Sequence, residues 1–145
     1  MRKPVRDGAT TIPESWNGFE TCSSSFNHYS YGAVCDFLFK YIAGIRPVEE
    51  DPGYKKIMIC PLPGGSLTQA RAAYDSIHGM IVSGWEKTAS GFHYEVEIPA
   101  NTCAIIRIQG NEADYRQILK NHPKSTFENG MIEIPVGSGI WSFRL

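Results

Sequence analysis

The chain has 145 residues, of which 42% are apolar, and its 14 basic and 15 acidic side chains give a formal net charge of −1. This length suits one domain, or one small domain and a piece of another, and allows roughly two thirds of the unfolded surface to be buried. Because no net positive charge is available to hold a phosphate backbone, we expect no nucleic-acid partner. No apolar run approaches the roughly 20 residues of a membrane-spanning helix, so we expect no membrane partner either.

Residues 1–48 are predicted to form a loop and one helix. Gly8, Pro13, Gly18 and a run of three serines are typical of a loop. A helix over Tyr31–Ile45 is indicated by apolar residues at three- and four-residue steps, and Gly44 and Pro47 predict its end. Two further phenylalanines make the helix apolar on more than one side, which is typical of a helix inside a larger helical assembly. We therefore expect these residues to be the remnant of a helical barrel. On its own, the helix is expected to dock on the following domain or to pair with a second copy of the chain as a homodimer.

Residues 49–145 are predicted to form an antiparallel, jelly-roll-like β-sandwich. In Phe92–Ile98 apolar and polar residues alternate, which is the pattern of a half-buried strand. About seven short strands separated by turns are typical of a sandwich. The other expected strands are Lys56–Cys60, Leu67–Tyr74, Met80–Glu86, Ala104–Ile108, Met131–Val136 and Trp141–Leu145, with turns that include Pro99–Asn101 and Gly137–Gly139, and a short helix within Glu112–Asn121.

The four cysteines show no spacing that is typical of a metal site. Cys35, Cys60 and Cys103 lie among apolar residues, so we expect them to be small buried hydrophobic side chains. Cys22 lies in the serine-rich loop and is the expected exposed thiol. We expect neither a metal ion nor a cofactor.

Polar and aromatic residues in the first 30 positions have the composition of a sugar-binding site. Asp7 and Glu14 lie near Trp16, and Asn27 and His28 follow before the helix. Aromatic faces pack on the C–H face of a pyranose ring, while carboxylates and imidazoles bind its hydroxyl groups. A purely structural interpretation stays open: Glu14 as an ordinary loop acid, His28 as a structural histidine. Ser25 or Asn27 would then be the helix N-cap.

The β half offers one weaker candidate, a binding patch of Asp75, His78 and Trp85. The simpler interpretation is that Trp85 belongs to the core and that Asp75 lies in a turn.

Several segments together resemble the C-terminal part of bacterial α-L-rhamnosidases, in the same order along the chain. Asp7–Gly18 and Ser25–Val34 are similar to segments near the end of the family's catalytic barrel. Asp36–Pro47 is similar to one of its barrel helices. The segments that resemble the family's C-terminal β-sandwich are Asp51–Lys56, Tyr74–Gly79 and Val136–Gly139.

The resemblance implies an (α/α)6 barrel followed by a β-sandwich, and hydrolysis of terminal α-L-rhamnose with inversion. It implies that Glu14 is the general base, that His28 contacts the sugar and that Trp16 walls the pocket. The family's general acid lies upstream of these segments. The chain is therefore expected to be a C-terminal fragment that is inactive alone, with rhamnose-containing glycans and an upstream barrel as partners. A bacterial protein is implied, and the cytoplasm, the periplasm and the exterior stay open as its location.

Two positions depart from the family's pattern. Pro13 stands before the acid where an aromatic residue is expected, and Cys35 stands where a glycine is usual. A proline fixes its own φ and restricts the preceding residue, so it bears on the direction of Glu14. The alternative function is a stand-alone β-sandwich that binds carbohydrate without hydrolysing it, through Trp85 or Trp141.

Overall fold

The computed structural model describes residues 6, 8, 10–15 and 25–145, which belong to two compact units, 1–37 and 38–145. The first unit contains a 3-10 helix, η1 (Tyr29–Gly32), and the short helix α3 (Ala33–Phe37). The second begins with a π-helical segment, η2 (Leu38–Ala43). It continues with β1 (Ile45–Pro47), β2 (Lys56–Ile59), β3 (Gln69–Ser76), β4 (Gly79–Thr88), β5 (Gly91–Gln109), α4 (Glu112–Leu119), β6 (Thr126–Glu128) and β7 (Met131–Arg144).

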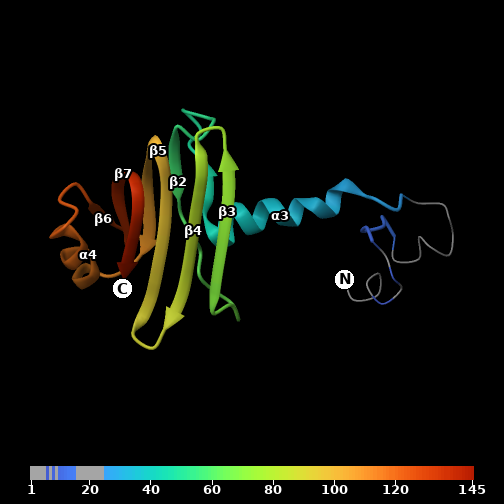
Figure 1. Cartoon of the computed structure of the whole chain (residues 1–145). Coiled ribbons are helices and arrows are strands. Elements are labelled where there is room, and N and C mark those ends of the chain that lie inside the picture. Colours follow the sequence, from blue (N-terminus) through green and yellow to red (C-terminus); the bar gives the residue numbers. More distant parts are fainter. Residues whose placement is uncertain (1–5, 7, 9, 16–24) are drawn as a thin grey trace. The chain divides into compact units, whose positions relative to one another are not determined.

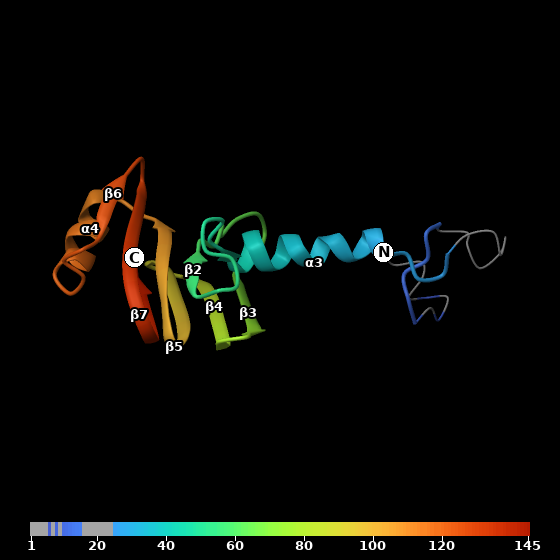
Figure 2. The ribbon, with the colours of Figure 1, turned by 90° about the horizontal axis from the view of Figure 1, so that it is seen from above.

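The strands of the second unit form one sheet, and the expected mainly β fold is confirmed. Along the sheet the order is β1-β2-β5-β4-β3, and β7 pairs with both β5 and β6. Figures 1 and 2 show α4 and β6 beside β7, at the end of the sheet remote from β3. Among the described residues, the strands pair in antiparallel fashion except for β2 with β5, which are parallel.

Two long strands, β5 and β7, run through both halves of the sheet. The first part of β5 pairs with β4 and with the end of β7, whereas its last part pairs with β2 and the start of β7. The predicted turns at Pro99–Asn101 and Gly137–Gly139 are therefore wrong, because both segments lie inside continuous strands. They form an irregularity instead: the register shifts between Ile98 and Cys103, and Asn101 has a φ of 60°. A bulge of this kind bends a strand without ending it.

The two halves of the sheet share one hydrophobic core. Tyr94, Ile106 and Ile134 are among its buried members, and the cluster draws on β1, β2, β4, β5, β7 and α4. Burial raises the pKa of the Tyr94 phenol to about 12. A sheet whose halves bury a common set of side chains is the sandwich-like arrangement expected from the alternating sequence.

The helical prediction for Tyr31–Ile45 is correct in its centre and wrong at its end. Helical structure stops at Ala43, and Ile45 is a buried residue of β1, paired with Ile59. Gly44 makes the change of direction with a φ of 83°, and its carbonyl accepts a 2.8 Å hydrogen bond from the Cys60 amide. Pairing with β2 thus overrides the helical periodicity at this β-branched residue.

The η2 segment packs on β1, β3 and β4. Within the second unit, the predicted docking of the helix on the sheet is therefore observed. Several of its apolar side chains stay exposed, including Leu38 and Tyr41. Pairing of two copies through the helix stays a prediction.

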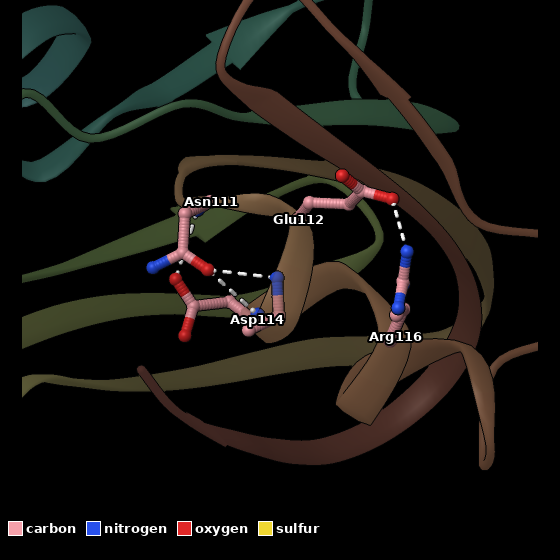
Figure 3. Close-up of polar contacts among 5 residues, drawn as sticks. Asn111, Glu112, Asp114 and Arg116 are labelled. Atoms are coloured by element: carbon pink, nitrogen blue, oxygen red, sulfur yellow. Dashed lines mark hydrogen bonds and ion pairs between the residues drawn. The ribbon is translucent and has the colours of Figure 1, made fainter.

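The short helix α4 confirms the expectation for Glu112–Asn121, and Figure 3 shows its first turn. The Asn111 side chain accepts hydrogen bonds from the amides of Ala113 and Asp114, at 2.8 and 3.1 Å. The Asp114 carboxylate accepts one in return from the Asn111 amide at 2.9 Å. This capping box satisfies amides that a helix start otherwise leaves without partners.

The expectation for the cysteines is partly wrong. Cys60 is buried as predicted, but Cys35 and Cys103 are exposed. Cys22 lies outside the described residues. Among the described residues, no helix is long and apolar enough to cross a membrane.

Candidate functional site

Glu14 and His28 are brought together by two stretches of chain that pair through their backbones. The Glu14 amide donates to the Ser25 carbonyl at 2.8 Å, and the His28 amide donates to the Ile12 carbonyl at 3.0 Å. The Thr11 hydroxyl adds a bond to the Phe26 carbonyl. Residues 11–14 therefore lie against residues 25–28, which explains how side chains 14 positions apart in the sequence become neighbours.

The Glu14 carboxylate is oriented by contacts at both of its oxygens. Oε2 accepts a 3.2 Å hydrogen bond from the Ser25 amide, and Oε1 lies 4.0 Å from Nε2 of His28. The Ser25 contact is reciprocal, because the two residues also pair through the Glu14 amide. A carboxylate that is held at one oxygen keeps the second oxygen in a defined direction.

His28 is the more enclosed partner. Its side chain is 26% exposed against 51% for Glu14, and its ring stacks on Tyr29 with centroids 5.2 Å apart. A distance of 4.0 Å is too long for a hydrogen bond and is the outer limit of an ion pair. An ion pair this exposed contributes at most about 1 kcal/mol to stability.

The neighbouring predictions have mixed outcomes. Trp16 and Asp7 lie outside the described residues. Pro13, the residue that departs from the family's pattern, is buried. The N-cap of η1 is His28, without a side-chain capping bond, so the N-cap alternative for Ser25 and Asn27 is wrong. The Ser25 hydroxyl instead accepts a hydrogen bond from the Asn27 amide, at 3.2 Å, within the turn before η1.

The predicted patch in the β half does not form. Trp85 is only 3% exposed, and its Nε1 donates a 2.8 Å hydrogen bond to the Ile42 carbonyl. The core interpretation of Trp85 is therefore confirmed, and Trp85 cannot serve as an exposed sugar platform. Asp75 lies in β3, one residue before its end, and not in the turn.

Sequence reasoning missed a hollow on β3, β4 and β5. Its volume is about 470 Å³, and Arg71, Gly84, Glu86, His93 and Glu95 are among its lining residues. One signal was present, since a glycine inside a strand often marks a close approach by another group. Within the described part of the chain, no cluster of three or more histidine, cysteine or acidic side chains is arranged to hold a metal ion.

Two family models match successive parts of the chain. Residues 2–42 match the bacterial alpha-L-rhamnosidase 6 hairpin glycosidase domain, and residues 44–122 match the bacterial alpha-L-rhamnosidase C-terminal domain. The Glu14–His28 pair lies in the first match and the hollow in the second.

Curated relatives and solved structures agree with the models. An alpha-L-rhamnosidase of Streptomyces avermitilis is 37% identical over 152 residues, and one of Formosa agariphila is 34% identical over 133 residues. The matches cover 98% and 87% of this chain, but the chain spans only 14% of the length of each relative.

Among solved structures, the Streptomyces avermitilis alpha-L-rhamnosidase in complex with L-rhamnose has a TM-score of 0.73 at 31% identity, and it covers 97% of this chain and 14% of its own. The alpha-L-rhamnosidase from Dictyoglumus thermophilum has a TM-score of 0.75 at 27% identity, with 97% and 16% covered. The chain therefore belongs to the bacterial α-L-rhamnosidase family and corresponds to the C-terminal part of its members.

Proposed function

We propose that these residues supply the general-base segment and the accessory β-sandwich of an α-L-rhamnosidase. The observation that carries the proposal is the Glu14 carboxylate, half-exposed and held 4.0 Å from His28 within a segment that matches a glycosidase domain. In this proposal residues 1–48 belong to the helical catalytic domain and residues 49–145 to the β-sandwich.

The proposed chemistry is hydrolysis with inversion. Glu14 removes a proton from a water molecule, whose oxygen forms a bond to the anomeric carbon of rhamnose. The glycosidic bond breaks on the opposite side of the ring, and a general acid from another part of the catalytic domain protonates the leaving oxygen. His28 binds a sugar hydroxyl beside the carboxylate, and Trp16 walls the pocket.

The 145 residues on their own are proposed to be inactive. An acid–base role contributes typically 10²–10⁴-fold to the rate, and positioning of the substrate is worth about 7–11 kcal/mol of the barrier. In this proposal the general acid belongs to another part of the catalytic domain. We therefore expect no measurable hydrolysis of an aryl α-L-rhamnoside by this chain.

A hybrid enzyme tests the role of Glu14. The matching C-terminal residues of the Streptomyces avermitilis relative are replaced by this chain, and hydrolysis of an aryl α-L-rhamnoside is measured. We expect Glu14→Gln to lower kcat by about 10²–10⁴-fold. A matched control is Glu50→Gln, which changes an exposed acid in a turn. A folded hybrid that keeps its full rate with Glu14→Gln would contradict the role. A rate from the 145-residue chain alone that Glu14→Gln abolishes would contradict the proposed inactivity.

A further inference from the structure

The outward face of the sheet carries two rows of residues in register, which are polar except for one glycine. Arg71, Gly84, Glu95 and Ser142 lie opposite one another across β3, β4, β5 and β7. The next row on the same face is Gln69, Glu86, His93 and Arg144. Residues between these rows, such as Trp85 and Tyr94, point to the core, because side chains alternate along a strand.

This face is hollow at Gly84, because glycine has no side chain. A Cβ at Gly84 would lie 3.2 Å from Cγ of Arg71, so the arginine side chain passes beside the glycine. The hollow over the two rows measures about 470 Å³, and a second one of about 360 Å³ shares Glu86 and His93 with it. Both fall within the roughly 300–1,000 Å³ of small-molecule sites.

One side chain of the hollow, that of His93, is held in place before any ligand arrives. Nε2 of His93 lies 2.9 Å from the Ser142 hydroxyl, within hydrogen-bond distance, and 4.0 Å from Oε1 of Glu95. The His93 side chain is 20% exposed, whereas that of Glu95 is 61% exposed and accessible to a ligand. Preorganised polar groups lower the entropy that binding would otherwise cost.

The lining favours a neutral ligand rich in hydroxyl groups. Two carboxylates repel an anion, and the Arg71 guanidinium repels a cation. Glu86 and Glu95 offer acceptors, while Arg71 and Gln69 offer donors. A hydroxyl group both donates and accepts, so neighbouring hydroxyls of one sugar ring can use both sets. The backbone at Gly84, which carries no side chain, leaves an uncharged floor for the C–H groups of the ring.

We propose that this hollow is an accessory binding site for one sugar ring of a glycan. All of its residues belong to the second unit and are distinct from Glu14 and His28. The proposal rests on the proposed function only in the choice of a rhamnoside as one probe.

The test is an NMR titration of the full chain, labelled with ¹⁵N, with two disaccharides. One is an α-L-rhamnosyl-glucose and the other is maltose. We expect saturable shifts of the amides of Arg71, Gly84, Glu86 and Glu95 with at least one of them. A response to the rhamnoside alone would identify the rhamnose ring as the ligand, and a response to maltose would identify the neighbouring sugar.

Three variants sharpen the titration. Glu95→Gln keeps the shape of an exposed side chain and removes its charge, so the apparent Kd should rise about tenfold. Gly84→Ala fills the hollow with a methyl group and should also weaken binding. Glu97→Gln is the matched control, since Glu97 lies on the same strand and lines neither hollow.

The proposal fails if neither disaccharide shifts these amides, or if Glu95→Gln and Glu97→Gln bind equally well. It also fails if the shifts are confined to residues 10–15 and 25–28. Failure of the proposed function is separate, because it is read from the effect of Glu14→Gln on hydrolysis by the hybrid.

Discussion

Trp85 donates its indole N–H to the carbonyl oxygen of Ile42 over 2.8 Å, which joins the centre of β4 to the end of η2. Two positions earlier, the buried Ser83 hydroxyl donates to the Ala43 carbonyl at 2.6 Å. The last carbonyls of a helix have no partner inside the helix, so β4 supplies them. The end of the helical segment is thus fixed on the sheet by polar contacts as well as by packing.

Replacing the indole tests this connection. Trp85→Phe removes the donor, leaves a buried carbonyl without its partner and opens a cavity. The expected loss in the free energy of unfolding is about 2–4 kcal/mol, measured by urea unfolding of the full chain. Trp141→Phe is the control: its Nε1 donates to the Gly137 carbonyl at 3.1 Å in an exposed setting, and a loss of about 1 kcal/mol is expected. Equal losses in the two variants would argue against the anchoring role.

Gly44 is predicted to tolerate no side chain. Its φ is 83°, and a Cβ would lie 2.1 Å from the backbone nitrogen of Pro61. Gly53 has a φ of 103° but no atom within 4 Å of such a Cβ. Gly53→Ala should therefore cost only about 1–2 kcal/mol of backbone strain. We expect Gly44→Ala to cost clearly more, because the clash is with backbone and cannot relax. Thermal unfolding of the pair measures the difference, and similar melting temperatures would contradict the clash.

The capping box of α4 is expected to carry most of the local stability of this helix. Asn111→Ala should lower the free energy of unfolding by about 1 kcal/mol. In Glu112→Gln, by contrast, the exposed pair between Glu112 and Arg116 is lost, at a cost of about 0.3–0.5 kcal/mol. Chemical unfolding of both variants measures the two losses. A larger loss for Glu112→Gln than for Asn111→Ala would contradict this prediction.

Because the phenol of Tyr94 is buried, we expect the folded chain to lose stability at alkaline pH. Burial raises the pKa of its phenol to about 12 in the folded chain, whereas an unfolded tyrosine ionises near 10. The neutral form is the one that the folded state keeps, so this contribution is fully present below pH 10 and is lost as the pH rises from 10 to 12. The loss amounts to at most about 3 kcal/mol.

The measurement is urea unfolding of the chain and of Tyr94→Phe at pH 8 and pH 11. The phenylalanine variant should lose less stability between the two values, while Tyr74→Phe, at an exposed position of β3, should behave like the parent chain. An identical pH dependence in all three proteins would contradict the assignment to Tyr94.

Local sequence patterns predicted the core of the sheet well. The alternation in Phe92–Ile98 correctly placed Tyr94, Val96 and Ile98 inside. The patterns failed where tertiary pairing decides the outcome. Ile45 continues a helical periodicity but pairs with Ile59, and the turn-like composition around Asn101 becomes a bulge because β7 continues past it.

The candidate sites show the same contrast between what local sequence predicts and what tertiary pairing decides. Composition and resemblance singled out Glu14 and His28, and the backbone pairing of residues 11–14 with 25–28 brings them together. For the hollow, the sequence offered only the signal of Gly84 inside a strand. The other lining residues come from separate strands whose register the sequence does not reveal.

The continuity of β5 and β7 has a consequence for how the domain melts. Because each strand crosses both halves of the sheet, neither half can open while the other keeps its complete ladder of backbone bonds. The second unit should therefore denature in a single all-or-none step. A chain break introduced near Asn101 or Ser138 would be needed to uncouple the two halves.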